Sequence, residues 1–341
     1  MCNPIRKVIK WLVNFKWLSG YVVRWFVFTI HLFTYSLIHL LLITYSLNHL
    51  ITCLYSKGTG TTAGVTLLSA NGVRQTALGG SGTSLSGDVY AIFYNPALLP
   101  DIPQKQLASS FALGLTDDSQ AAVLYGLKKF AVGIFYLNGG RIEINYVDGT
   151  SRNVVAQSDC LATLGWGGYS SKNVALGYNL KYLSSKLVES YASEAIAFDM
   201  GLQLKSTNNR FRFGLAAQNF GTSLKYRSQK ESLPFLVRSG ISYNFPIRFA
   251  HPRINSGATH SLLFIFDSFY LFKENNLYNS AGLEYSIFEK YFLRAGCRFL
   301  PDRNSFTIGL GVSFAEKFSL DWSTEFAELN IPHKIAFTVK F

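Results

Sequence analysis

Few residues in this chain have types and spacings that could carry out chemistry, and those that do are scattered. Beyond residue 56 the histidines are His251, His260 and His333, and neither a paired-histidine motif nor GxSxG is present. The glycine-rich run 79–82 lacks the Lys-Ser/Thr pair that completes a phosphate-binding loop. We therefore expect a protein that is not an enzyme, with no catalytic residue, no metal site and no cofactor.

The four cysteines give no stronger indication of a chemical site. Cys2 and Cys53 lie near the N-terminus, whereas Cys160 and Cys297 lie far apart, each inside an expected strand. No CxxC motif is present, so neither a zinc site nor a redox motif is predicted. The simplest interpretation is two single thiols on apolar faces, and a disulfide between them stays open.

The charged residues follow a clearer pattern, because they alternate with large apolar residues. In 173–182, Leu176, Leu180 and Tyr182 share one face, while small or polar residues and Lys181 share the other. A period of two is typical of β-strands. A strand face of small residues fits the crowded inside of a closed wall, and a large apolar face fits lipid. The alternative is a water-soluble β-sandwich, whose polar face would be richer in Lys, Glu and Thr.

Alternation over residues 105–341 predicts an all-β protein, a transmembrane antiparallel β-barrel of about fourteen strands. Residues 141–157 are expected to form an outward hairpin extension that turns at Asp148-Gly149. An even number of strands places both ends of the barrel on the periplasmic side. The segments 219–233 and 247–257 are expected to be loops.

Charged residues on the small faces are expected to point into the lumen. A charge on the lipid side would cost about 2–4 kcal/mol at the bilayer midplane. One interpretation is a ladder of ion pairs that braces adjacent strands, and the other is a lumen that binds an anionic or amphipathic ligand. The residues concerned are Lys181, Asp199, Lys205, Arg210, Arg212, Arg238, Asp267, Glu284, Arg294, Arg298, Asp321 and Glu325.

Residues 1–56 have the character of a leader segment. They carry five basic residues, no acidic residue and a long apolar stretch, as expected of a signal that is removed. Lipidation at Cys53 and a retained membrane helix are the alternatives. Without this segment the formal charge of +12 falls to +7. The remaining charge is spread out and forms no basic stripe, so nucleic acid is not an expected partner.

Residues 57–104 are expected to form a plug segment in the lumen. Between 72 and 100 the chain is rich in Gly and Ser, with a pattern too broken for a helix or a long strand. Asn95 is expected to cap local backbone groups and Pro96 to fix the backbone where the plug leaves for the first strand. The candidate plug residues are Gly72, Arg74, Gly79, Gly80, Tyr94, Asn95 and Pro96.

The last strand, 334–341, ends on Phe341 with an apolar residue at every second position. This ending resembles the signal that the outer-membrane assembly machinery recognises. Blocks within residues 72–97 resemble the N-terminal signature of the PorV/PorQ family of FadL-like outer-membrane barrels. Similar blocks follow in order, so that the resemblance spans roughly residues 65–341: LGYNLKYLSS (176–185), AFDMGLQLK (197–205), LAAQNFG (215–221) and LPFLVRSGISYNF (233–245).

The resemblance implies a fourteen-stranded barrel in the outer membrane of a diderm bacterium, in contact with lipid, with the N-terminal segment folded into its lumen. In PorV-like relatives such a barrel acts in type IX secretion and receives secreted client proteins. In FadL-like relatives the segment acts as a hatch, and hydrophobic small molecules pass. The secretion carrier is the preferred expectation, with a transporter of hydrophobic small molecules or a structural role as alternatives.

Overall fold

The computed structural model describes most of the chain beyond residue 62, namely residues 63–69, 71–114, 117–188, 190–227, 229–249, 258–300, 304–326 and 332–341. The chain divides into two units, Met1–Tyr55 and Ser56–Phe341, and all of the described residues belong to the second. The expected leader and Cys53 lie outside the described residues, so the leader stays a prediction. Among the described helices, none is long and apolar enough to cross a bilayer.

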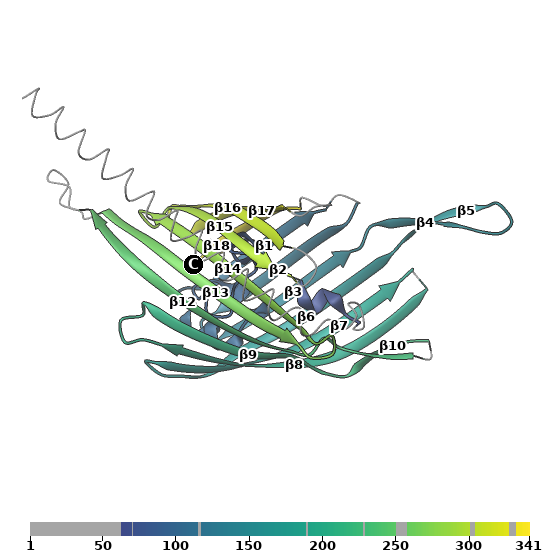
Figure 1. Cartoon of the computed structure of the whole chain (residues 1–341), viewed down its shortest axis with the longest axis horizontal. Coiled ribbons are helices and arrows are strands. Elements are labelled where there is room, and N and C mark those ends of the chain that lie inside the picture. The colour runs from purple at the N-terminus through teal and green to yellow at the C-terminus, as the bar shows by residue number, and fades with distance from the viewer. Residues whose placement is uncertain are drawn as a thin grey trace, which may run out of the picture. The chain divides into compact units, whose positions relative to one another are not determined.

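The chain forms a closed barrel of fourteen antiparallel strands, as the alternation predicts (Figure 1). Around the barrel the order is β1-β18-β17-β16-β15-β14-β13-β12-β9-β8-β7-β6-β3-β2, and β2 pairs with β1 to close it. The barrel strands are β1 (Gln106–Leu113), β2 (Ser119–Leu127), β3 (Phe130–Asn138), β6 (Gln157–Ser170), β7 (Val174–Leu187), β8 (Tyr191–Lys205), β9 (Phe211–Gly221), β12 (Leu236–Phe249), β13 (Ala258–Leu271), β14 (Asn276–Ile287), β15 (Tyr291–Phe299), β16 (Asn304–Phe314), β17 (Phe318–Phe326) and β18 (His333–Lys340).

Two further hairpins extend from one end of the barrel, which we call the hairpin end; the C-terminus lies at the other, the terminal end (Figure 1). One hairpin is β4 (Arg141–Asn145) with β5 (Ser151–Val155), and its turn includes Asp148 and Gly149, the latter at φ 81°. This hairpin is confirmed. The other, β10 (Ser223–Tyr226) with β11 (Gln229–Ser232), lies where a loop was expected. Its strands have four residues each, too few for alternation to be distinguished from chance.

The two strand faces differ as expected. In β16, Phe306, Ile308, Leu310 and Phe314 are 41–57% exposed on the outside of the barrel. Ser305 and Thr307, on the opposite face, are almost completely buried inside it. The same outward apolar band recurs around the wall, which is the surface that a lipid bilayer covers. The soluble sandwich is therefore wrong, since the sheet closes on itself and shows its large apolar side chains to the outside.

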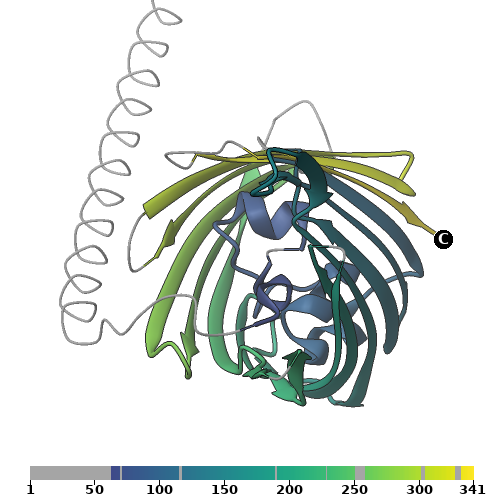
Figure 2. The same ribbon diagram turned by 90° about the vertical axis from the view of Figure 1, so that its right-hand side faces the viewer.

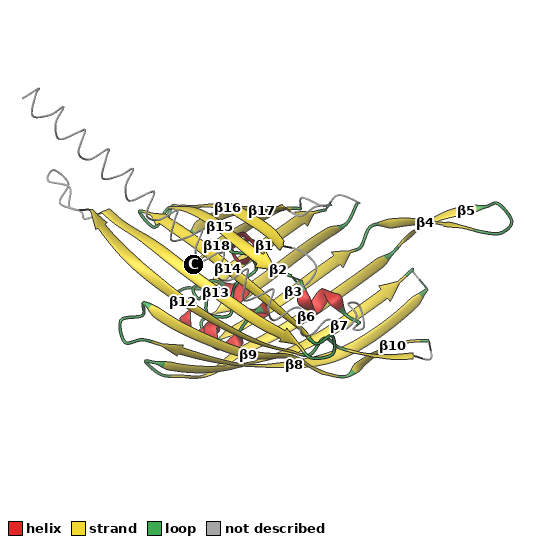
Figure 3. Ribbon diagram, viewed as in Figure 1, coloured by secondary structure: helices red, strands yellow, loops and turns green. Residues whose placement is uncertain are grey.

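The segment before β1 lies in the lumen and holds the helical part of this unit. It contains the short helix α2 (Val73–Ala77) and three 3-10 turns, η1 (Val65–Leu68), η2 (Val89–Phe93) and η3 (Pro96–Asp101). Figure 2, a view along the barrel, shows these turns surrounded by the strands. In Figure 3 the helical elements are red and the strands of the wall are yellow. We call residues 63–104 the plug.

Candidate functional site

The plug is held by wall side chains that bind its backbone. Asp267 of β13 is 1% exposed, and its Oδ2 accepts hydrogen bonds from Gly82 N (2.7 Å), Thr83 N (2.8 Å) and Thr83 Oγ1 (2.6 Å). An irregular buried segment has no partner strand or helix for its backbone, so side chains must replace them. One lumen carboxylate therefore fixes the conformation of the 82–83 turn.

Asn95, a residue of the plug itself, also binds plug backbone groups through its side chain. Its Oδ1 accepts from Ala97 N at 3.0 Å and caps η3. Its Nδ2 donates to Thr83 O (2.9 Å) inside the plug and to Leu202 O (3.0 Å) on β8. Asn95 therefore links two turns of the plug to the wall. Pro96 follows at the first position of η3, where its missing N–H costs nothing.

Uncharged polar side chains of the wall bind the rest of the plug backbone. These residues were not among the expected site residues, because Thr, Asn and Gln on a small face indicate only that the face is polar. Their contacts connect positions up to 230 residues apart, which strand periodicity cannot reveal. The pairs are Thr307 with Ala77 O and Gly79 N, Gln106 with Gly87 O and Val89 N, Asn179 with Ile92 O, Gln218 with Phe93 O and Tyr94 O, and Ser242 with Ser84 O.

Wall glycines let the plug backbone approach closely. Gly282 and Gly296 are register partners on β14 and β15. A Cβ on Gly282 would lie 2.7 Å from Leu78 Cβ, and one on Gly296 would collide with Gly79 N. Gly79 itself has φ 72°, a conformation that favours glycine. The close approach thus requires glycine on the wall, and the left-handed turn favours glycine in the plug.

The charged residues join the plug to the wall more than they join adjacent strands. Arg74 pairs with Glu284 of β14 at 2.7 Å and with Asp88 of the plug at 3.3 Å. Arg294 of β15 pairs with the same Glu284 at 2.7 Å and with Asp321 of β17 at 2.5 Å. Burial raises the pKa of the Asp88 carboxyl, against the opposing effect of Arg74. The five groups form one connected network that ties α2 to β14, β15 and β17 and to the start of η2.

A second charged cluster holds the end of the plug. Asp101 accepts from Lys205 at 2.7 Å and from Gln203 at 3.1 Å, and it pairs with Arg212 at the start of β9. Burial raises the pKa of Asp101, but the hydrogen bond from Lys205 and the charge of Arg212 outweigh burial and hold it below its ordinary value. Asp88 and Asp101, both missed from the sequence, are the plug's own contribution to the ion pairs.

The remaining expected lumen charges have separate places. Lys181 and Asp199 form a buried pair at 2.8 Å between β7 and β8, the ladder arrangement expected from the sequence. Arg298 pairs with Glu325 at 3.3 Å, and its Nε donates to Gly79 O at 3.1 Å.

Arg238 and Arg210 depart from that arrangement. Arg238 lies over the rings of Tyr94 (5.2 Å) and Phe269 (4.7 Å). Arg210 lies in the turn before β9, exposed and outside the barrel strands. The expected strand began two residues earlier, which is why the alternation assigned Arg210 to the lumen.

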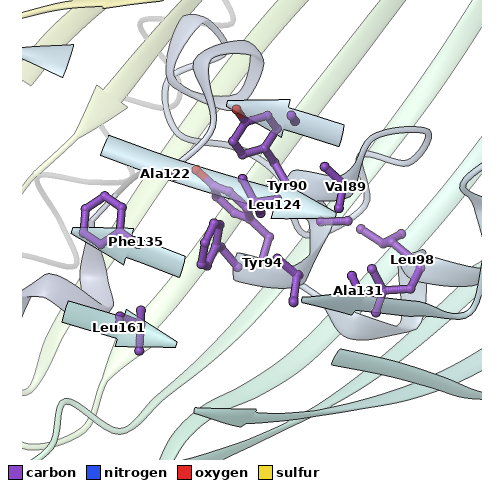
Figure 4. Close-up of a cluster of buried hydrophobic side chains, with 14 of the residues drawn as sticks. Val89, Tyr90, Tyr94, Leu98, Ala122, Leu124, Ala131, Phe135 and Leu161 are labelled. Carbon is purple, nitrogen blue, oxygen red and sulfur yellow. The ribbon is translucent and has the colours of Figure 1, made fainter. Parts of the chain in front are cut away.

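The other half of the lumen is apolar. Plug side chains from η2 and η3, including Val89 and Leu98, form one apolar cluster with inward side chains of β2, β3 and β6 (Figure 4). Leu183 of β7 belongs to the same cluster. Phe135, Leu161 and Leu183 break the small-residue rule for inward positions, and each is at most 2% exposed. The apolar surface continues toward the hairpin end, where Ala63 and Leu67 pack against it. The lumen thus has an apolar side and a charged side.

The plug's N-terminal turn is tied down at the apolar side. Thr66 Oγ1 donates to Asp159 of β6, which is fully buried. Gln157 Nε2 (2.7 Å) and Ser185 Oγ (2.5 Å) donate to the same carboxylate. Asp159 occupies an inward position of an expected strand, so the alternation could have indicated it.

Solved structures supply the comparison, since no family model and no curated protein matches this chain. The Ralstonia pickettii toluene transporter TbuX matches with a TM-score of 0.52 and 14% identity, over 79% of this chain and 98% of that one. The chain has the fold of these channels. The Pseudomonas putida toluene transporter TodX (TM-score 0.50, 12% identity, 78% and 96% covered) and the CymD monoaromatic hydrocarbon channel (0.51, 12%, 79% and 97%) agree.

The likeness extends to the fold, a closed antiparallel β-barrel like that of these channels. Identities of 12–14% establish a shared fold alone. The expected PorV/PorQ membership is a finer assignment, which these comparisons leave as a prediction. The two described cysteines beyond the leader, Cys160 and Cys297, are free.

Proposed function

We propose that this protein is an outer-membrane channel for small hydrophobic molecules. The observation that carries the proposal is the apolar side of the lumen, where large inward residues replace the small ones found elsewhere. Three hydrocarbon channels with the same fold support it, because this chain matches nearly the whole length of each. On this proposal the barrel lies in the outer membrane of a diderm bacterium with its hairpin end outside.

In this proposal η1 is the cap of the hydrophobic route. Leu67 covers the apolar surface at the hairpin end, where Leu183 and Leu224 lie against Gly64. Among the described residues, Thr66 binds the cap to the wall through its side-chain hydrogen bond to Asp159. Displacing η1 exposes an apolar surface toward the outside while Asp267, Thr307 and Gln218 keep the remaining plug in place.

The experiment is an uptake assay in a lipopolysaccharide-bearing host. Cells that produce the protein should accumulate radiolabelled toluene faster than cells carrying an empty vector. Glucose uptake, measured in parallel, controls for a general leak in the membrane. Equal toluene rates, with folded barrel present in the outer membrane, would overturn the proposal.

The secretion carrier remains a prediction with less support. The three channels named above carry hydrocarbons by their descriptions, and none of these three is described as a secretion component. A client protein that co-purifies from the native outer membrane would favour the carrier, whereas a bound hydrophobic molecule would favour the channel. We expect the second result.

A further inference from the structure

Three cavities follow the seam where β18 meets β1, at the border between the charged and the apolar side of the lumen. An outer chamber of about 200 Å³ opens at the hairpin end, where Leu113, Arg298 and Glu325 line it. An inner chamber of about 130 Å³ lies toward the terminal end, between Arg74, Asp321 and Lys340. Between them lies a narrow cavity of about 10 Å³. That volume holds about one water molecule.

The wall residues of the seam form a groove with a lysine near each end. Paired inward positions in its middle are small: Ala336 faces Ser110, and Thr338 faces Ala108. Lys334 lines both the outer chamber and the narrow cavity, and Lys340 lines the inner chamber. Because β18 and β1 carry no bulky inward side chain in the middle of the groove, its width there is set by the plug and by Phe135 of β3.

The first turn of α2 provides the restriction. Gly72 and Val73 line the narrow cavity, and the next residue, Arg74, lines the inner chamber. Val73 is 1% exposed and lines the narrow cavity, so its side chain takes up space at the restriction. The first turn of α2 thus lies beside the cavity that separates the two chambers.

We propose that this seam is a second path, for small polar solutes that carry both charges, restricted by Val73. Each chamber has both signs of charge on its lining: Arg298 with Glu325 in the outer one, Arg74 with Asp321 in the inner one. Such a lining can form hydrogen bonds and ion pairs with both an ammonium and a carboxylate group, in place of the water that they lose. A hydrocarbon can form neither kind of interaction. The path follows the β18–β1 seam and meets the apolar side only where Gln120 and Phe135 line the narrow cavity. It does not rest on the proposed hydrocarbon transport.

The test measures efflux of labelled glycine, a small zwitterion, from proteoliposomes that contain the full-length protein. The unchanged protein should pass little glycine, and Val73→Gly should raise the efflux severalfold. Adding Ser110→Leu to Val73→Gly should abolish the increase, because Ser110 lines the narrow cavity. Ser109→Leu is the matched control: Ser109 is the same residue type on the same strand but faces outward, and it should leave the increase unchanged.

The outcomes separate the possibilities. No increase with Val73→Gly, in protein that shows the gel shift between boiled and unboiled samples, would overturn the path. An increase that Ser110→Leu fails to block would mean that the whole plug has loosened, which also overturns it. Toluene uptake by Ser110→Leu alone should match that of the unchanged protein, so a failed hydrocarbon channel and a failed polar path give different results.

Discussion

At the scale of the residue, single side chains in this lumen each satisfy several backbone groups. Asp267 binds two backbone N–H groups and a hydroxyl, while Thr307 and Gln218 each bind two plug backbone groups. A buried donor left without a partner costs about 1–3 kcal/mol. A few wall side chains therefore hold the plug, and losing any one of them costs free energy. We expect each loss to disturb only the part of the plug that the side chain binds.

Replacing Asp267 by alanine tests this arrangement. We expect the barrel to fold, because its strand pairing does not depend on that side chain, and the 82–84 turn to become accessible. The measurement is limited proteolysis of the purified protein, with cleavage sites read by mass spectrometry. Ser268→Ala, at the neighbouring position of β13, is the control. Resistance of the Asp267→Ala plug equal to that of the control would contradict the assigned role.

At the scale of the element, the sequence predicts the wall far better than the plug. Alternation identifies fourteen strands, their faces and the 141–157 extension, because a strand in a closed wall must alternate. Arg210 was misplaced because strand ends are the least regular part of that pattern. The plug has no period, and its partners, such as Gln218 for Phe93 O, lie more than a hundred residues away.

The apolar inward residues were missed for a related reason. Leu161 and Leu183 occupy the positions that elsewhere hold small residues, so the alternation is blurred where β6 and β7 face the plug. A sequence pattern reports which face a residue occupies but not what fills the lumen opposite it. The apolar side, which carries the functional proposal, could therefore be found only from the structure.

The close contact between the plug backbone and the wall glycines can be tested by substitution. Gly296→Ala would place a methyl group against Gly79 N, so we expect the plug to be displaced near residues 78–80. The readout is increased conductance in planar bilayers with the barrel still folded by gel shift. Gly168→Ala, where the nearest atom would be an ordinary 3.4 Å away, is the control. Unchanged conductance for Gly296→Ala would contradict the close contact.

At the scale of the whole molecule, the barrel closes where its last strand meets its first. Phe341 is 57% exposed, its N–H binds Lys105 O at 3.0 Å, and its ring stacks on Tyr125 at 6.2 Å. An exposed terminal aromatic ring is available to another protein before closure. The assembly signal assigned to Phe341 from the sequence remains a prediction, and this exposure is compatible with it.

Substituting Phe341 by alanine separates assembly from stability. We expect severalfold less barrel in the outer membrane at equal synthesis, measured by quantitative immunoblotting of membrane fractions. The unfolding temperature of the barrel that does assemble should stay close to that of the unchanged protein. Phe337→Ala removes an outward ring from β18, the strand that Phe341 directly follows, and is the control. Equal amounts of assembled barrel for the two variants would contradict the role of Phe341 as an assembly signal.

In the proposed function, hydrophobic molecules cross the lumen on its apolar side, under a cap formed by η1. Thr66 and Asp159 touch through their side chains, so cysteines at both positions would bring two sulfurs close together. The background carries serine in place of Cys160 and Cys297. The controls are the single variants Thr66→Cys and Asp159→Cys. Mass spectrometry verifies that the disulfide has formed in the double variant. We expect oxidation of the double variant to stop most radiolabelled toluene uptake and a reductant to restore it. Unchanged uptake with the disulfide verified would contradict transport under the cap.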